Sequence, residues 1–588
     1  MRMSVPRYAA PPMRSLIVAV ATAAALLDPA AHARAGDPVM PLADVRSGML
    51  CTGYSVVRGT DVVSFDVEVI DVVDDRSGGV GPRILVRASG PAVDETGIGP
   101  GFSGSPIYCP DGLGVQRNIG AISEAIGEYG GKVVLATPIE AILGNQVDAP
   151  QRRNVAAMPA GATPLAAPLT VTGLGTRLGA ALQRAAAKRG RLVLAAPAGP
   201  LGSFPVQQLR PGSAFGVGYA SGDIAVSAIG TVAYTDGDKV WGFGHPLDGV
   251  GARSLLLQDA YVFRVINNPV AIGESSGTYK YAAAGHDVGT LTNDSLDAVV
   301  GRVGGLPPTV PVRVFATDLD TGAKRTVVTN VADETAVDQP TGGSILTFLA
   351  PLAVTEAAGR VLGGSPARLT GRACFTIRLR ETSSPVRFCN RYVSDVPDAL
   401  GAGNVVAGAA STDLLEALSL IDAFKAGTVH VTGIDVDVRI ARGQRQAFLR
   451  DVRLPARARA GQKVAATLRL QHVRGRMERR AVRLRLPRDL RPGKRRVVFT
   501  GADVDSAEGD LSGLFDIDFE FGGTGGELGP PTLRRLLRRI DDLGRYDGIS
   551  ARRPSSNPEG FDPGTPSYRA KDVRISGSAR ATIRIQKR

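Results

Sequence analysis

The chain has 588 residues, which is too long for a single hydrophobic core, so we expect two or three domains. Gly (72) and Pro (39) are abundant and aromatic residues make up only 5%, a composition that favours many short strands and turns over a helical bundle. The sequence contains no phosphate-binding loop, metal-ligand spacing or cofactor motif, so we expect neither a cofactor nor a metal. The expected fold class is mainly β.

The first 35 residues have the pattern of a signal peptide. Arg2, Arg7 and Arg14 precede an apolar stretch at residues 15–27, and small residues near 31–35 form a cleavage site. The alternative is an uncleaved anchor, but the stretch is shorter than the roughly 20 residues that span a bilayer. We therefore expect a secreted or cell-envelope protein with no stable membrane span after signal removal.

The four cysteines fit an oxidising compartment, because disulfides persist only there. Cys374 and Cys389 flank a predicted hairpin and are expected to pair. Cys51 and Cys109 are then left for each other. None has the spacing of a structural zinc site.

The pattern of short strands and turns predicts two β-rich regions before residue 430. The predicted segments are a β-rich region at 36–144, a linker with one helix at 145–203, and a second β-rich region with a helical extension at 204–430. The second region contains a predicted hairpin turn at 235–238, of composition Thr-Asp-Gly-Asp.

Residues 431–505 alternate apolar and basic side chains and are predicted to form a basic β-sandwich. Within 431–500, 20 Arg and Lys stand against five Asp and Glu, a net charge of +15 that exceeds the +13 of the whole chain. Such a surface suits an anionic envelope polymer, although the Arg side chains could simply solvate the strands. No nucleic-acid motif is present, and we expect no nucleic-acid partner. Residues 506–588 are predicted to be a flexible, Gly/Pro/Arg-rich tail with a short helix at 531–543.

The sharpest chemical signal is Gly-Phe-Ser-Gly-Ser-Pro at 101–106. Glycines on both sides of Ser103 allow a tight turn that brings amide groups next to its hydroxyl. Ser103 could attack a carbonyl while the amides of Gly101 and Ser103 hold the oxyanion. The alternative interpretation is a glycine-rich turn without chemistry.

A serine nucleophile needs a base, and His245 in Gly-Phe-Gly-His-Pro at 242–246 is the candidate. The alternative is an ordinary turn histidine. His286 is the rival base, but its sequence context indicates no strand end of comparable clarity.

These two motifs, together with residues 119–121, 228–234 and 288–291, resemble the SpoIVB-type serine peptidases over about a third of the chain. The resemblance implies a chymotrypsin-like double β-barrel, with a serine-motif half at 36–144 and a histidine-motif half at 204–430. It also implies that Ser103 is the nucleophile and His245 the base. In that family the histidine segment precedes the serine segment, whereas here the order is reversed, as in a circular permutation. Geometry rather than chain order defines a triad, so the reversal is compatible with activity.

The family places a triad acid several residues before the serine motif, and Asp94 is the candidate here. Glu95 is the neighbouring carboxylate. We expect an exported serine endopeptidase that cleaves a protein or peptide substrate. The alternatives are an inactive, peptidase-like envelope binding or scaffold protein, and an esterase that shares the nucleophile.

Overall fold

The structure is a computed structural model, and the chain is mainly β. The described residues are 36–73, 81–126, 130–147, 163–164, 169–188, 192–197, 205–267, 277–337, 345–364, 366–394, 405–424, 426–473, 475–488, 490–501, 529–543, 548–552, 566–569 and 573–586. The predicted signal peptide at 1–35 lies outside them. So do parts of the predicted linker at 145–203.

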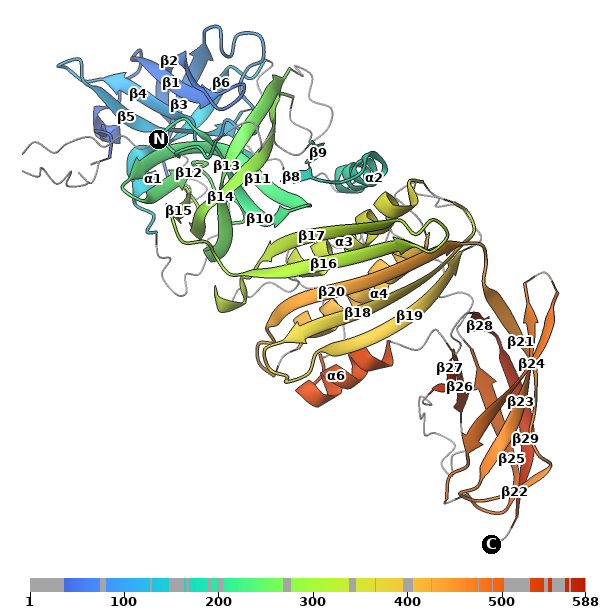
Figure 1. Cartoon of the computed structure of the whole chain (residues 1–588). Helices are drawn as coiled ribbons and strands as arrows, with labels where there is room; N and C mark the ends of the chain where they lie inside the picture. Colours follow the sequence, from blue (N-terminus) through green and yellow to red (C-terminus); the bar gives the residue numbers. More distant parts are fainter. Residues whose placement is uncertain are drawn as a thin grey trace, which may run out of the picture. The chain divides into compact units, whose positions relative to one another are not determined.

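The serine motif belongs to a closed six-stranded barrel (Figure 1). Strand β4 pairs with both β1 and β5, which closes the ring β1-β2-β3-β6-β5-β4, and β7 extends the sheet beside β5. Strand β2 alternates buried and exposed residues, so that every second side chain points into the barrel, whereas most residues of β4 and β5 are buried. Their bounds are β1 Leu50–Val56, β2 Val62–Val73, β3 Arg83–Ser89, β4 Pro106–Pro110, β5 Gln116–Ala125, β6 Val133–Pro138 and β7 Thr163–Pro164, followed in chain order after β6 by helix α1 Ile139–Leu143.

The histidine motif belongs to a second sheet of 13 strands. Six of them, in the order β10-β13-β14-β15-β12-β11, are joined in a ring because β10 also pairs with β11. The predicted hairpin turn at 235–238 is confirmed, since it joins β11 to β12. The strands of this ring and its edge are β8 Leu169–Thr172, β9 Val193–Ala196, β10 Ala214–Gly222, β11 Ala225–Asp236, β12 Lys239–Gly242, β13 Gly251–Ile266, β14 Tyr279–Asp294 and β15 Val299–Val303.

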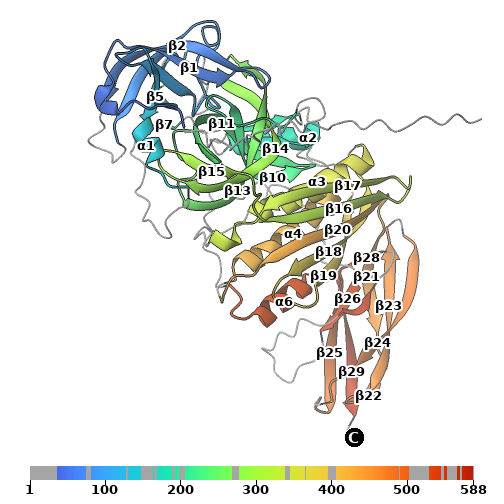
Figure 2. The same ribbon diagram turned by 60° about the vertical axis from the view of Figure 1, so that its left-hand side comes forward.

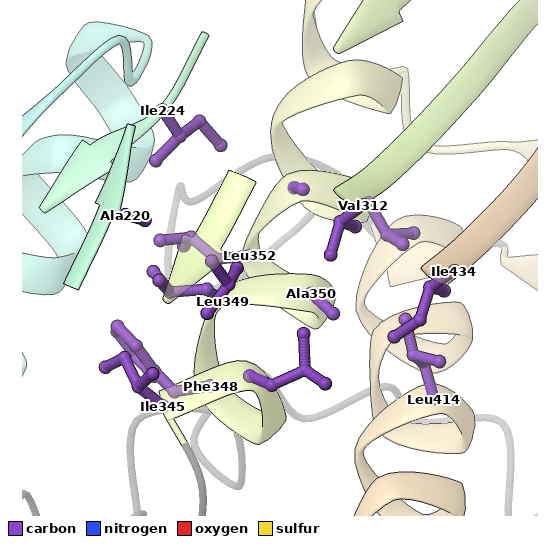
Figure 3. Close-up of a cluster of buried hydrophobic side chains, with 14 of the residues drawn as sticks. Ala220, Ile224, Val312, Ile345, Phe348, Leu349, Ala350, Leu352, Leu414 and Ile434 are labelled. Atoms are coloured by element: carbon purple, nitrogen blue, oxygen red, sulfur yellow. The ribbon is translucent and has the colours of Figure 1, made fainter. Parts of the chain in front are cut away.

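The other five strands of this sheet form a platform that two helices cover on one face (Figures 1 and 2). Helix α3 packs on β16 and β17, and α4 packs on α3, β18 and β19. Their apolar side chains interlock in one core (Figure 3). The bounds are β16 Thr309–Asp318, β17 Lys324–Ala332, α3 Ile345–Leu362, β18 Leu369–Leu379, β19 Val386–Ser394, α4 Val405–Asp422 and β20 Val431–Arg442, and a further helix, α2 Thr176–Ala187, packs on β9.

Helix α3 has the length and composition of a membrane span, and it is the one such helix found in the part of the chain that the structure describes. Most of it is buried, since residues such as Leu349, Ala353 and Ala357 pack inside the protein. Its apolar character is thus accounted for by its place between the sheet and α4.

Two smaller sheets share one hydrophobic core near the C-terminus. Their strands come from both sides of the predicted boundary at residue 505, because the expected tail contributes β26 to β29 as well as the expected helix, α6. Strand β20, which was expected in this region, instead pairs with β16 and β18. The bounds are β21 Gln446–Arg453, β22 Arg457–Arg459, β23 Lys463–His472, β24 Met477–Arg485, β25 Gly493–Thr500, α6 Leu533–Asp542, β26 Gly548–Arg552, β27 Pro566–Arg569, β28 Arg574–Ser576 and β29 Ser578–Gln586.

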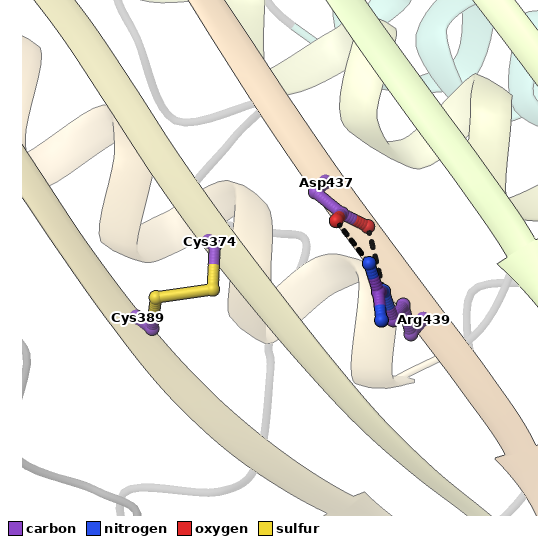
Figure 4. The surroundings of a disulfide bond; sticks show 4 residues. All are labelled: Cys374, Cys389, Asp437 and Arg439. Carbon is purple, nitrogen blue, oxygen red and sulfur yellow. Dashed lines mark hydrogen bonds and ion pairs between the residues drawn. A yellow bond between two sulfur atoms is a disulfide. The ribbon is translucent and has the colours of Figure 1, made fainter.

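Both predicted disulfides are confirmed. Cys51 in β1 is bonded to Cys109 in β4, across the strand pair that closes the first barrel. Cys374 and Cys389 lie directly opposite each other on β18 and β19, beside the Asp437–Arg439 ion pair of β20 (Figure 4). Two disulfides are consistent with an oxidising, extracellular compartment.

Candidate active site

Ser103 lies in the turn that leads from the first barrel's β3 into β4, and its side chain is fully buried. Its Oγ has no hydrogen-bond partner within the described part of the chain. The backbone amides of Phe102, Gly104 and Ser105 donate to the carbonyl oxygens of Gly99, Ile122 and Phe102 respectively. Over the same described residues, the amides of Gly101 and Ser103 donate to no acceptor. An oxyanion hole is built from backbone amides that are free to donate in this way.

The serine turn packs directly against the second sheet. The amide of Thr231 in β11 donates to the carbonyl oxygen of Ser103 at 2.8 Å. Gly104 adopts φ +91°, and a Cβ added there would lie 1.8 Å from the carbonyl oxygen of Thr231 and 2.7 Å from the amide of Phe243. Only glycine allows this approach, so Gly104 is what brings the serine turn next to the histidine segment.

His245 follows the end of β12 and is also buried. Two residues earlier, Phe243 has φ +64°, the one positive φ outside glycine among the described residues. A positive φ is unfavourable for a bulky residue, so surrounding contacts must hold Phe243 in this conformation. Phe243 packs on Phe215 with ring centroids 5.1 Å apart, and Thr137 in β6 donates a 2.6 Å hydrogen bond to the carbonyl of Gly244. A strand of the first barrel is thereby hydrogen-bonded to the histidine segment.

The His245 ring is oriented by its own chain. Nδ1 lies 2.6 Å from the carbonyl oxygen of Pro246. A carbonyl only accepts, so Nδ1 carries the proton, and Nε2 is the basic nitrogen in the neutral ring. This is the tautomer that a general base for serine needs.

A buried carboxylate, Asp294 at the end of β14, holds the loop after His245. It accepts backbone hydrogen bonds from Leu247, Asp248 and Gly249, at 2.8, 2.8 and 2.9 Å. Arg253 lies 3.7 Å from it and also pairs with Asp248 at 2.7 Å. Burial raises the pKa of Asp294 to about 6, against the lowering effect of Arg253. Sequence reasoning missed this residue because it is 49 positions from His245.

The structure does not join Asp94 to the histidine. Its carboxylate pairs with Lys132 at 3.0 Å, and both side chains are exposed. The rival base, His286, pairs with a different carboxylate, since its Nδ1 lies 2.9 Å from Oδ2 of the buried Asp259. Of the predicted catalytic residues, the structure therefore brings the Ser103 and His245 segments together and leaves Asp94 apart.

Lys280 in β14 is a second residue that sequence reasoning missed. It is fully buried behind the serine turn, with Nζ 2.7 Å from Ser55 Oγ and 3.0 Å from Thr231 Oγ1. Burial lowers its pKa to about 7. No group of three or more His, Cys, Asp or Glu that could hold a metal occurs among the residues described.

Comparisons with protein-family models, with curated proteins and with solved structures find no match for this chain.

Proposed function

We propose that the chain is an exported serine endopeptidase of the SpoIVB type, with Ser103 as nucleophile and His245 as general base. The observation that carries the proposal is the contact of the two turns: Thr231 and Phe243 lie against Gly104, one residue from the serine. The motifs that resemble the family are the segments in contact. In this proposal the two barrels form a permuted, chymotrypsin-like pair, and the C-terminal sheets form a β-sandwich.

The reaction follows from the groups present. Ser103 Oγ attacks the peptide carbonyl carbon as its proton passes to His245 Nε2, and the amides of Gly101 and Ser103 bind the oxyanion. The imidazolium then protonates the leaving amine, and water hydrolyses the ester on Ser103. Ser103 and His245 share no hydrogen bond here, and such bonds often tighten only when substrate is bound.

The orienting group in this proposal is a carbonyl instead of a carboxylate. The Pro246 carbonyl selects the tautomer of His245, as a triad acid does, but brings no full negative charge to stabilise the imidazolium. Loss of the acid typically costs about 10⁴ in turnover in a serine protease. We therefore expect a slow enzyme whose rate depends on the amides and on binding.

The test is covalent labelling of the full mature chain with a fluorophosphonate. Wild-type protein should be labelled at Ser103, the Ser103→Ala variant should not, and His245→Gln should be labelled at least about 100-fold more slowly. Ser64→Ala is the matched control, because it removes an exposed hydroxyl of β2 that lies outside the serine turn. Circular dichroism would establish that each variant is folded. Absence of labelling in folded wild-type protein would refute the hydrolase.

The second candidate is a non-catalytic function as a binding protein for an anionic envelope polymer, and one observation favours it. On the outward face of β23 and β24, Lys463 lies opposite Arg485 and Arg469 opposite Arg479. Like charges directly opposite each other destabilise a sheet. No ion pair to a carboxylate compensates these four cations within the described residues. A polyanion laid across the two strands would relieve their repulsion.

This candidate is tested on the full chain, because the two C-terminal sheets need strands from beyond residue 500. Inorganic polyphosphate is the probe. Binding should weaken from low to high salt and fall at least about tenfold in an Arg469→Glu, Arg479→Glu double variant. Binding that is indifferent to both salt and charge reversal would exclude the surface.

A further inference from the structure

Lys280 is buried under the serine turn and contacts three positions of it. Its backbone amide donates to the carbonyl of Pro100 at 2.9 Å. Its methylenes lie under Gly101, where an added Cβ would be 2.8 Å from Lys280 Cβ. Its Nζ lies 4.5 Å from the centroid of the Phe102 ring.

Two hydroxyl groups carry the amine's hydrogen bonds on to the turn. Nζ donates to Thr231 Oγ1 at 3.0 Å, and Thr231 Oγ1 in turn donates to the carbonyl of Gly101 at 2.9 Å. Nζ also donates to Ser55 Oγ at 2.7 Å, and Ser55 Oγ lies 2.9 Å from Ser105 Oγ. One branch therefore ends at Gly101 and the other at Ser105.

In the sequence, Ser103 lies between the two ends of the network, since the branches end at Gly101 and Ser105. The carbonyl of Gly101 belongs to the peptide next to the Gly101 amide, so its bond to Thr231 helps to fix the orientation of the turn backbone. An oxyanion hole works only when its amides are held before the reaction, and the bond from Thr231 restrains the peptide next to the Gly101 amide.

Stability alone does not explain a lysine here. Burial disfavours the charged amine, and an apolar side chain of similar length would fill the space without that cost. What an apolar side chain would not supply is the pair of hydrogen bonds to Ser55 and Thr231. No carboxylate pairs with Lys280 among the described residues, so the hydroxyls are its polar partners.

We propose that Lys280 is a positioning residue for the serine turn: through Ser55 and Thr231 it holds the backbone on which the Ser103 nucleophile and the oxyanion amides depend. The proposal rests on the proposed function for its catalytic meaning. The ordering of the turn is a physical claim that can be measured without activity.

The experiment is native-state hydrogen exchange of the full mature chain, read on peptides that cover residues 100–106. Lys280→Met should speed exchange of the hydrogen-bonded amides of this turn at least about tenfold, with exchange in β16 and β17 unchanged. Gln258→Met is the matched control: Gln258 is buried and polar on the neighbouring strand β13, but its side chain bonds to Ser227 and Asp287. It should leave exchange of the turn unchanged.

A second variant covers the case in which Lys280→Met does not fold. Thr231→Val keeps the shape of the side chain and cuts only the branch to Gly101, and it should speed exchange of the turn about threefold or more. The proposal would be overturned if the turn of the folded Lys280→Met variant exchanged at the wild-type rate. If only Thr231→Val folds, the same result for that variant would overturn it.

Fluorophosphonate labelling separates the two claims. If wild type is labelled, Lys280→Met should slow labelling of Ser103 about 100-fold at equal folded fraction, which a merely structural lysine would not do. Equal labelling rates would overturn the positioning role. If folded wild type is not labelled, the hydrolase fails, while hydrogen exchange still decides whether Lys280 orders the turn.

Discussion

His245 donates its Nδ1 proton to the carbonyl oxygen of the next residue, Pro246, at a distance of 2.6 Å. The histidine is therefore oriented by its own backbone, and the shape of the 246–249 loop determines where the ring points. Asp294 determines that shape by accepting three amides of the loop. The carboxylate acts on the loop and not on the ring.

Replacing Asp94 should have little effect. The Asp94 carboxylate pairs with an exposed lysine, Lys132, and such surface pairs contribute at most about 1 kcal/mol. Asp94→Asn should change the labelling rate of Ser103 by less than about twofold, because nothing joins this carboxylate to His245. A loss near the 10⁴ typical of a missing triad acid would restore Asp94 to the mechanism.

Replacing Asp294 should be costly in both stability and reactivity. Asp294→Ala leaves the amides of Leu247, Asp248 and Gly249 without their buried acceptor, while Arg253 keeps its bonds to Asp248 and Glu334, and we expect a loss of about 3 kcal/mol in the free energy of unfolding. Urea denaturation measures the loss. Labelling of Ser103 should slow at least about tenfold in the fraction that stays folded. Asp238→Asn, in an exposed pair with Arg302, is the control and should be near wild type.

Gly104→Ala should separate the two turns. The added Cβ would overlap the carbonyl oxygen of Thr231, and φ +91° is itself unfavourable for alanine. We expect a loss of more than about 2 kcal/mol in unfolding free energy and no labelling. Gly112→Ala has open space around the new methyl and should behave as wild type. A stable, reactive Gly104→Ala variant would show that the close contact is unnecessary.

Lys280 should make stability depend on pH in the alkaline range. Its pKa is about 7 in the folded chain, lowered by burial from the ordinary 10.5. Between these values the unfolded chain holds a proton that the folded chain has released, so stability rises with pH, by up to about 1.4 kcal/mol per unit. Below pH 7 both states are protonated and this contribution is flat.

The Lys280→Met variant isolates that contribution. Urea denaturation of both proteins from pH 6 to pH 10 should show wild type gaining on the variant only above about pH 7. A difference that is constant over this range would mean that the amine keeps an ordinary pKa.

Local patterns were sufficient to predict several parts of the fold. The hairpin between β11 and β12, both disulfides and the helix α6 follow from turn composition, cysteine placement and apolar spacing within a few residues. Strand β29, at Ser578–Gln586, alternates buried and exposed residues as a strand should. The glycines and prolines that precede it nevertheless led to the expectation of a flexible tail. The composition of the whole segment concealed the alternation of apolar and polar residues that is typical of a strand.

By itself, the sequence determined the two glycine-bracketed turns that carry Ser103 and His245, because a turn is specified by the residues within it. Only the tertiary structure decided that these turns, 142 positions apart, pack against each other through Gly104. It also decided which charged groups support them. In the sequence, Asp294 has the context of a turn residue and Lys280 that of a solvent-facing strand residue. Whether either side chain is buried depends on the strands that pair around it, and no local sequence pattern specifies that pairing.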